Sequence, residues 1–385
     1  MTTVPNDLVL AVTAWCDAVD RGECMPTDRL VRAAVEDDRF DTVLVANPYR
    51  SAPVLWMRRL SGHGEPVLPD GPGRRRQVTP VRIRRHDPAG RVALERAHRR
   101  YARTLGNLAG SLAMTRPTVI TANPFTAAYG DFGWARTVTY FAWDDWSAHP
   151  AFEKWRPQYD DAYARLREHG VRIAAVSEPL RARVAGGDGG VVVPNAVDGR
   201  EWTVPSSPAP PVLAAAAPPR ILYVGTLDGR LDVDAVIATA RRFANGTVVL
   251  AGLVADPAHL APLHGEANVV IAGPQGRADV VAMVRAADAC VIPHLRSPLT
   301  ETMSPLKLYE YLAGGRPVAA TDLAPMCGID DSVQLVGRGE PFEDAVARAL
   351  ERGPMSEAAR LDFIRCNSWE DRMTRIFELA GVVTG

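Results

Sequence analysis

The sequence predicts an α/β protein built from two doubly wound, Rossmann-like domains that face each other across a cleft. Three observations lead to this prediction. A chain of 385 residues is too long for one ordinary core. Short apolar runs alternate with amphipathic helical patterns along most of its length, which is typical of parallel sheets covered on both faces. A proline-rich stretch interrupts that alternation near the middle.

The first domain is predicted to span residues 1–200, because its apolar runs have strand length and its longer periodic segments have helical spacing. Its expected strands are 8–13, 41–46, 118–121, 137–141, 171–176 and 191–193, and its expected helices are 28–36, 94–114 and 153–168.

Residues 201–219 are predicted to form a linker, because this stretch is rich in proline and ends in Pro218-Pro219. The second domain is expected at 220–366. Its predicted strands are 221–224, 247–251, 269–272, 289–293 and 317–321, and its predicted helices are 233–243, 278–287, 305–313 and 343–351. Residues 368–380 read as a final amphipathic helix.

Composition narrows the class of protein. Apolar residues make up 47% of the chain and charged residues 23%, the balance of a globular protein, and no apolar run approaches the ~18–20 residues that cross a bilayer. The N-terminus lacks the pattern of a signal peptide, so a cytoplasmic protein is expected. The five cysteines form no CxxC pair, which argues against a disulfide framework and a zinc site. We expect no metal, no cofactor and no nucleic-acid partner.

Positive charge is concentrated in Arg74–Arg116, where twelve arginines face only Asp87 and Glu95. One interpretation is a basic surface for an anionic membrane, with peripheral contact at the inner membrane face, or for a phosphorylated acceptor. The other is an ordinary solvated face in a protein that uses arginine almost exclusively, because only two of its 44 basic residues are lysines.

The stretch Thr300–Thr321 carries the most chemical information. It reads as a polar loop, a helix with Ser304 as N-cap and Pro305 at its first position, a Gly-Gly stop and a buried strand. A helix start offers unpaired N–H groups that suit a diphosphate. Lys307 in the first turn suggests an anionic ligand, and Glu310 could accept two ribose hydroxyls. The alternative is a capped surface helix on which Lys307 and Glu310 form an ordinary ion pair.

The same stretch resembles the donor-binding motif of glycosyltransferase family 4. The pattern E-x-L-A-x-G-x-P-V is matched by Glu310, Leu312, Ala313, Gly315, Pro317 and Val318, and the variant SPLKLYEYLAGGRPV is similar to the branch of teichuronic-acid and capsular polysaccharide transferases. The resemblance extends over Ile221–Thr321 and, more thinly, the rest of the chain. It implies a GT-B fold, in which residues 367–385 return to the first domain. It also implies retaining, metal-independent sugar transfer from a nucleotide-diphosphate donor.

The resemblance also assigns roles to residues. Glu310 would hold the ribose, and Gly273 with Pro274 would border the base. The glycine turn at Gly225 and Thr226 would lie at the diphosphate. The backbone amides of Met303, Ser304 and Leu306 would face the sugar or the diphosphate.

Two departures from the family pattern matter. Thr226 stands where the family usually has an arginine, which leaves Arg230 and Lys307 as the expected phosphate-binding cations and Arg296 as a third candidate. Thr302 stands where an acidic residue normally binds sugar hydroxyls, so the donor sugar is expected to be held differently.

In the first domain, Asp144 and Asp145 follow a predicted strand in a segment that resembles a Y-x-x-x-D-D motif of the polysaccharide branch. Their carboxylates could deprotonate or orient an acceptor hydroxyl. Equally, they could cap the next turn, which is what Asp does most often after a strand.

The acceptor is left open by the sequence. A cell-envelope saccharide or glycolipid is the leading interpretation, and a small natural-product acceptor is the alternative. A sugar-nucleotide epimerase of the same shape and a non-catalytic relative also remain. A dinucleotide dehydrogenase is disfavoured because no G-x-G-x-x-G follows an opening strand, and Asp232-Val-Asp234 is discounted as a metal motif because it begins a helix.

Overall fold

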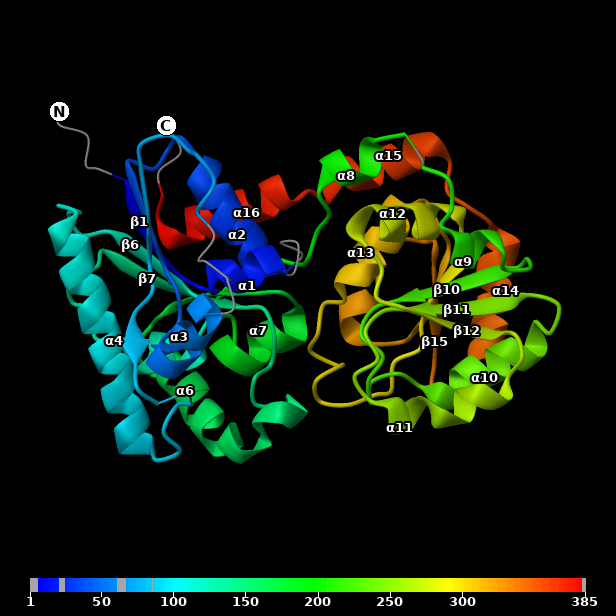
Figure 1. The fold of residues 1–385 in the computed structure, drawn as a ribbon, viewed down its shortest axis with the longest axis horizontal. Helices are drawn as coiled ribbons and strands as arrows, with labels where there is room; N and C mark the ends of the chain where they lie inside the picture. Colours follow the sequence, from blue (N-terminus) through cyan, green and yellow to red (C-terminus); the bar gives the residue numbers. More distant parts are fainter. Residues whose placement is uncertain (1–5, 21–24, 61–66, 85, 206, 383–385) are drawn as a thin grey trace. The chain divides into compact units, whose positions relative to one another are not determined.

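A computed structural model describes residues 6–20, 25–60, 67–84, 86–205 and 207–382. The chain forms two compact units, of which the first comprises residues 1–194 with 370–385 and the second residues 195–369 (Figure 1). Each unit is a parallel sheet with helices packed on it, so the predicted α/β class with two Rossmann-like domains is confirmed.

The first unit contains a seven-stranded parallel sheet in the order β4-β2-β1-β6-β7-β8-β9. Its strands are β1 (Asp7–Ala11), β2 (Thr42–Ala46), β4 (Arg74–Val78), β6 (Thr118–Thr121), β7 (Thr137–Ala142), β8 (Arg172–Ala175) and β9 (Val191–Val192). A separate two-stranded ribbon pairs β3 (Arg50–Ser51) with β5 (Val81–Arg82). Its helices are α1 (Trp15–Asp20), α2 (Pro26–Glu36), α3 (Ala52–Leu60), α4 (Arg91–Ser111), α5 (Pro124–Tyr129), α6 (Arg156–Glu168), α7 (Glu178–Ala185) and α16 (Trp369–Ala380).

The second unit contains a six-stranded parallel sheet in the order β12-β11-β10-β13-β14-β15. Its strands are β10 (Arg220–Val224), β11 (Thr247–Ala251), β12 (Val269–Gly273), β13 (Ala289–Ile292), β14 (Val318–Thr321) and β15 (Val333–Val336). Its helices are α8 (Gly199–Thr203), α9 (Pro211–Ala214), α10 (Val233–Arg242), α11 (Pro257–Leu260), α12 (Arg277–Ala286), α13 (Leu306–Ala313), α14 (Phe342–Arg352) and α15 (Glu357–Cys366).

Alternation along each strand of the second unit builds a core on both faces of the sheet. On β10, Leu222 packs into the cluster that contains the apolar side of α12 and α13, whereas Ile221 and Tyr223 pack into the cluster under α10 and α14. Because both faces are covered, ligands can approach this sheet at the ends of its strands. The strand order reverses between β10 and β13, and in such sheets the crevice outside the carboxyl ends at this switch point is where ligands bind.

The structure treats the predicted linker at 201–219 differently from the sequence analysis. Most of it belongs to the second unit, whose first described residue is Asn195 rather than a residue after 219. Trp202 on α8 and Leu213 on α9 are fully buried in the core of that unit. The prolines interrupt the alternation of strands and helices as expected. Two apolar side chains in short helices nevertheless anchor the segment to the second unit.

The C-terminal helix α16 belongs to the first unit, as the expected return of residues 367–385 requires. Phe377 packs edge-on against Phe40, with ring centroids 5.1 Å apart. The carbonyl of Ala380 accepts a hydrogen bond of 2.7 Å from the hydroxyl of Thr137 at the start of β7. Figure 1 shows this helix, in red, on the first unit although the preceding helix α15 belongs to the second.

Candidate functional site

The turn after β10 is shaped by glycine because the backbone and a side chain approach it closely. Gly225 has a φ of +149°, and a Cβ added there would lie 2.6 Å from Nζ of Lys307. The neighbouring Gly252, after β11, would place a Cβ 1.9 Å from the carbonyl oxygen of Gly225. The amino group of Lys307 therefore rests directly against the glycine turn at the switch point of the sheet.

Lys307 reaches this position from the first turn of α13. Its Nζ donates a hydrogen bond of 2.7 Å to the hydroxyl of Tyr223, and the hydroxyl of Tyr223 donates one of 3.2 Å to the carbonyl of Thr226. Nζ also lies 3.5 Å from Nε2 of His294. Part of the Lys307 side chain stays accessible, although protein atoms crowd its amino group.

The surroundings of Lys307 disfavour its charge. Burial, followed by the repulsion of Arg230, lowers the pKa of Lys307 to about 7, and the more distant carboxylates of Asp228 and Glu310 offset only part of this shift. Among the described residues, no carboxylate forms an ion pair with Lys307. A cation that lacks a counter-ion beside a glycine turn is a suitable partner for an anionic ligand.

His294 is the second buried polar group of this cluster and lies two residues after the end of β13. Its side chain is buried, and among the described residues its Nδ1 has no hydrogen-bond partner. Burial, together with the charges of Lys307 and Arg230, lowers the pKa of His294 well below its ordinary value. The ring therefore stays neutral, and its Nδ1 is a buried polar atom without a hydrogen-bond partner among the described residues.

Arg230 lies in the loop after the glycine turn and is paired with Asp228. Its Nη2 lies 2.7 Å from Oδ2 of Asp228, and its Nε donates a hydrogen bond of 2.9 Å to Oδ1. Burial alone would raise the pKa of Asp228, but the hydrogen bonds from Arg230 outweigh it and the net shift is downward. About one third of the Arg230 side chain is exposed (33%), so it can still contact a ligand.

Glu310 lies on α13 one turn beyond Lys307, but the two do not form the ordinary ion pair that was the alternative interpretation. Instead, Oε1 of Glu310 accepts from Nη1 of Arg277 at 2.5 Å. Arg277, the first residue of α12, also donates from Nε to Oε2 of Glu201 at 2.7 Å, and its guanidinium lies 5.7 Å from the ring centroid of Trp202. Arg277 thus fixes the orientation of the Glu310 carboxylate.

The start of α13 differs by one residue from the prediction. Pro305, not Ser304, is the N-cap, and no side chain caps the helix. Ser304 is buried, and its carbonyl accepts a hydrogen bond of 2.6 Å from Nδ2 of Asn195. The amides of Ser304 and Leu306 donate to no acceptor within the described parts of the chain, as a ligand-binding helix start requires.

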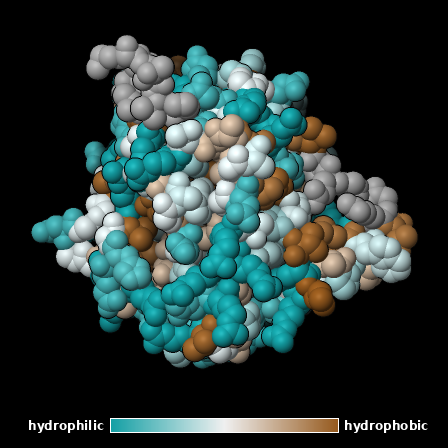
Figure 2. Space-filling model, turned by 90° about the vertical axis from the view of Figure 1, so that its left-hand side faces the viewer, coloured by the Kyte–Doolittle hydropathy of each residue, from teal (hydrophilic) through white to brown (hydrophobic). Residues whose placement is uncertain are grey.

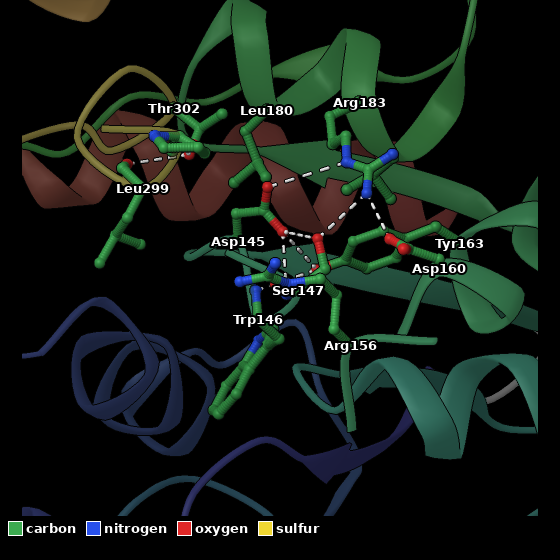
Figure 3. Close-up of polar contacts among 12 residues, drawn as sticks. Asp145, Trp146, Ser147, Arg156, Asp160, Tyr163, Leu180, Arg183, Leu299 and Thr302 are labelled. Atoms are coloured by element: carbon green, nitrogen blue, oxygen red, sulfur yellow. Dashed lines mark hydrogen bonds and ion pairs between the residues drawn. The ribbon is translucent and has the colours of Figure 1, made fainter. Parts of the chain in front are cut away.

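The predicted role of the Met303 amide is wrong, because this amide donates to the carbonyl of Leu299 at 3.1 Å within a tight turn. The hydroxyl of Thr302 donates to the same carbonyl at 3.0 Å (Figure 3). Glu301 lies 3.3 Å from Arg296, so its carboxylate does not take the position of the missing acidic residue at Thr302.

Gly273 and Pro274 lie where the base was expected, at the carboxyl end of β12. Gly273 has a φ of +66°, and its carbonyl accepts a hydrogen bond of 2.8 Å from the amide of Gly252. No atom lies within 4 Å of a Cβ built on Gly273, and Pro274 is exposed. This end of the site is therefore open enough for a planar ring.

In the first unit, the side chain of Asp145 follows the capping interpretation. Its Oδ1 accepts from the amide of Ser147 at 3.0 Å and from the hydroxyl of Ser147 at 2.7 Å, and Tyr163 donates to the same oxygen at 3.3 Å (Figure 3). Only 3% of Asp145 is exposed. Asp144 is half-buried, and its Oδ1 accepts from the amide of Asp145 at 2.9 Å.

The sequence analysis missed three members of the site: Tyr223, His294 and Arg277. Tyr223 looked like an ordinary strand residue, and His294 is one position beyond the apolar run that defined its strand. Arg277 contacts Glu310 across 33 residues of sequence. The available signal was positional, because all three lie at the carboxyl edge of strands β10 and β13 or at a helix start beside that edge.

Among the described residues, no group of three or more His, Cys, Asp or Glu side chains is arranged to hold a metal ion. In the same part of the chain, no helix has the length and apolar character that a membrane span requires.

Comparison with known proteins finds a family match within the second unit. Residues 218–352 match the family model described as "Glycosyl transferases group 1". A curated relative, the putative teichuronic acid biosynthesis glycosyltransferase TuaH of Bacillus subtilis, is 38% identical over 56 residues. That alignment spans only 14% of the relative's length and 14% of this chain.

Solved structures match almost the whole chain. Sucrose-phosphate synthase from Thermosynechococcus elongatus superposes with a TM-score of 0.66 at 14% identity, covering 97% of this chain and 98% of that one. An α,α-trehalose-phosphate synthase (UDP-forming) from Burkholderia xenovorans, solved in complex with glucose-6-phosphate, gives 0.63 at 12% identity, covering 98% and 100%. At such identities the likeness shows the fold. The chain therefore has a GT-B fold, and residues 218–352 of its second unit are similar to group 1 glycosyltransferases.

Proposed function

We propose that this protein is a glycosyltransferase that moves a sugar from a nucleotide-diphosphate donor to a hydroxyl group of an acceptor. One observation carries the proposal: the amino group of Lys307 lies against the Gly225 turn, at the switch point of the second sheet, without a carboxylate partner among the described residues. A diphosphate supplies the missing negative charge, and the uncapped start of α13 supplies N–H donors for it.

Each part of the donor has a matching group. The diphosphate lies between the glycine turn, Lys307 and Arg230. Glu310 accepts hydrogen bonds from the ribose hydroxyls while Arg277 holds its carboxylate. The base extends toward Gly273, where the surface is open.

The leaving group needs the most electrostatic stabilisation, because breaking the bond to the sugar leaves negative charge on the diphosphate. A donor diphosphate beside Lys307 favours the charged form of the amine and draws a proton onto it. Lys307 and Arg230 then stabilise the departing charge without a metal ion. We further propose that the anomeric configuration is retained, as the resemblance to family 4 implies.

The proposed acceptor is a cell-envelope saccharide or glycolipid. The support is the short match to a relative whose name refers to teichuronic acid biosynthesis, together with the basic character of the first unit. A small natural-product acceptor remains the alternative, and it is tested by the same transfer assay with a different acceptor panel.

The test is release of nucleoside diphosphate and formation of glycosylated product with UDP-, GDP- and dTDP-sugars. Lys307→Met should slow transfer by about 100-fold or more, the usual cost of removing one donor to a developing negative charge. Lys154→Met is the matched control, because the only other lysine of the chain lies on the Trp155 ring in the first unit. NMR of the product gives the anomeric configuration. If Lys307→Met transfers sugar at the rate of the control, the donor site has been misplaced.

A further inference from the structure

The arginines of Arg74–Arg116 do not form one uniform surface, because several are used within the fold. Arg75 donates to four backbone carbonyls, including that of Val35 at 2.8 Å. Arg82 pairs with Asp87, and Arg99 pairs with Glu95 at 2.7 Å. Arg85 lies outside the described residues. These arginines explain part of the charge without any ligand.

Three other arginines converge on a groove of about 570 Å³ in the first unit. Arg84 comes from the segment after β5, and Arg96 and Arg100 lie one turn apart on α4. Within the described part of the chain, none of the three has a carboxylate partner, and no Asp or Glu lines the groove. The volume is in the range of ordinary ligand pockets, roughly 300–1,000 Å³.

The same groove has apolar walls. Ile83 is 85% exposed and Val81 is 52% exposed, although both are β-branched residues of a type that is normally buried. Ala97 and the ring of Tyr49 complete this side. Figure 2 shows the side of the first unit that carries α4: it is mainly hydrophilic, and hydrophobic residues appear in separate patches among the charged ones. The groove thus combines three arginine side chains that lack a carboxylate partner in the described part of the chain with exposed apolar side chains.

Its position in the fold is that of a ligand site. Tyr49 follows β2 and Val81 follows β4, so the groove lies at the carboxyl edge of the parallel sheet. α4 begins beside it at Gly90, without a side-chain cap and without an acidic residue in its first turn. A helix start left in this way adds N–H donors and a partial positive charge to the arginines.

We propose that this groove binds a single amphiphile with a phosphate-type head group, the head on Arg84, Arg96 and Arg100 and the first part of the hydrocarbon chain on Ile83 and Val81. Such a lipid phosphate could carry the acceptor sugar, an assignment that rests on the proposed function. Binding of the amphiphile itself requires no donor and no transfer.

The proposal is tested by equilibrium dialysis of the full chain at low ionic strength, without nucleotide. Three probes separate the two halves of the groove: octyl phosphate below its micelle-forming concentration, inorganic phosphate, and octyl glucoside. Octyl phosphate should bind at one site, about tenfold more tightly than either of the other two, because only it satisfies both the charge and the apolar wall.

Variants assign the site. Arg100→Gln should weaken octyl phosphate binding by about tenfold, whereas Arg103→Gln, the same charge change on the same exposed helix outside the groove, should leave it unchanged. Ile83→Ser should weaken octyl phosphate but not inorganic phosphate. A melting curve of each variant shows that the fold is kept, since these side chains are exposed.

Three results would overturn the proposal. Equal weakening by Arg100→Gln and Arg103→Gln would mean general charge attraction. Equal binding of octyl phosphate and inorganic phosphate would mean that the apolar wall is not used. Binding to anionic vesicles without binding of monomeric octyl phosphate would mean a membrane-facing patch instead of a groove for one molecule. A parallel titration with UDP, GDP and dTDP keeps the two proposals apart, because it reports on the second unit alone.

Discussion

Replacing Lys307 by Met should weaken donor binding and, at the same time, make the empty protein more stable. Methionine keeps the unbranched shape of the lysine stem and removes the amino group. In the structure this group lies against Gly225 and Tyr223, near Arg230, and it has no carboxylate partner among the described residues. The folded protein therefore carries a charge-bearing group in a place that disfavours its charge.

The magnitude follows from the lowered pKa. An unfolded lysine has a pKa of about 10.4, whereas burial lowers that of Lys307 to about 7. Between these values the unfolded chain binds a proton that the folded chain releases, so the free energy of unfolding of the wild type rises with pH from about 7 to about 10. At pH 7.5 the full pKa shift would lower the free energy of unfolding of the wild type by about 3–4 kcal/mol. Because part of the side chain reaches solvent, we expect a stabilisation by Lys307→Met of about 1–3 kcal/mol.

Unfolding followed by tryptophan fluorescence measures this effect. The transition of the second unit is the one that added nucleotide shifts in the wild type, and Lys154→Met is the control for loss of a lysine elsewhere. The stabilisation should shrink as the pH rises from 7 to 9. If Lys307→Met is destabilised throughout this range, with the same pH dependence as the wild type, the amino group is well accommodated in the empty site and the reasoning fails.

Three further changes give separate checks. Gly225→Ala should weaken nucleotide binding by about tenfold or more, since its methyl group displaces the Lys307 amine from a turn with φ of +149°; calorimetry measures the loss, and unchanged affinity would contradict the role of the turn. Asp145→Ala should lower the free energy of unfolding by about 1–3 kcal/mol through loss of its bonds to Ser147; a large fall in kcat with unchanged stability would instead restore it as a catalytic base. Arg360→Met should lower the free energy of unfolding by about 2–4 kcal/mol, because the buried guanidinium donates to two carbonyls of the second unit. The folded variant should keep its nucleotide affinity.

The fold class and much of the element order could be predicted because the strands of both sheets are apolar and separated by amphipathic helices. Strand β4 was not predicted, because its sequence Arg-Arg-Arg-Gln-Val lacks the apolar run of a buried strand. It lies at the edge of its sheet, where side chains can reach solvent. The short helices α8 and α9 were hidden in a proline-rich stretch, where composition indicates a linker and only the burial of Trp202 and Leu213 shows otherwise.

The candidate site was predicted in part for a related reason. Lys307 and Glu310 were found because both lie on one helix start within a local pattern. Their partners could not be found in this way, because Tyr223 and Arg277 are distant in sequence and meet α13 only through the order of the strands. The interpretation of Lys307 and Glu310 as an ion pair failed because each has a partner from another element.

The central claim is that the second unit binds a nucleotide through Glu310 and Lys307. Calorimetric titration of the purified protein with UDP, GDP and dTDP, repeated on Glu310→Gln, tests it most directly. The account predicts that one nucleotide binds, and that the substitution weakens it by about tenfold or more, roughly 1.4 kcal/mol, because the ribose hydroxyls lose their carboxylate. Binding of equal strength to both forms would contradict the ribose assignment, and no binding to the wild type would contradict the donor site itself.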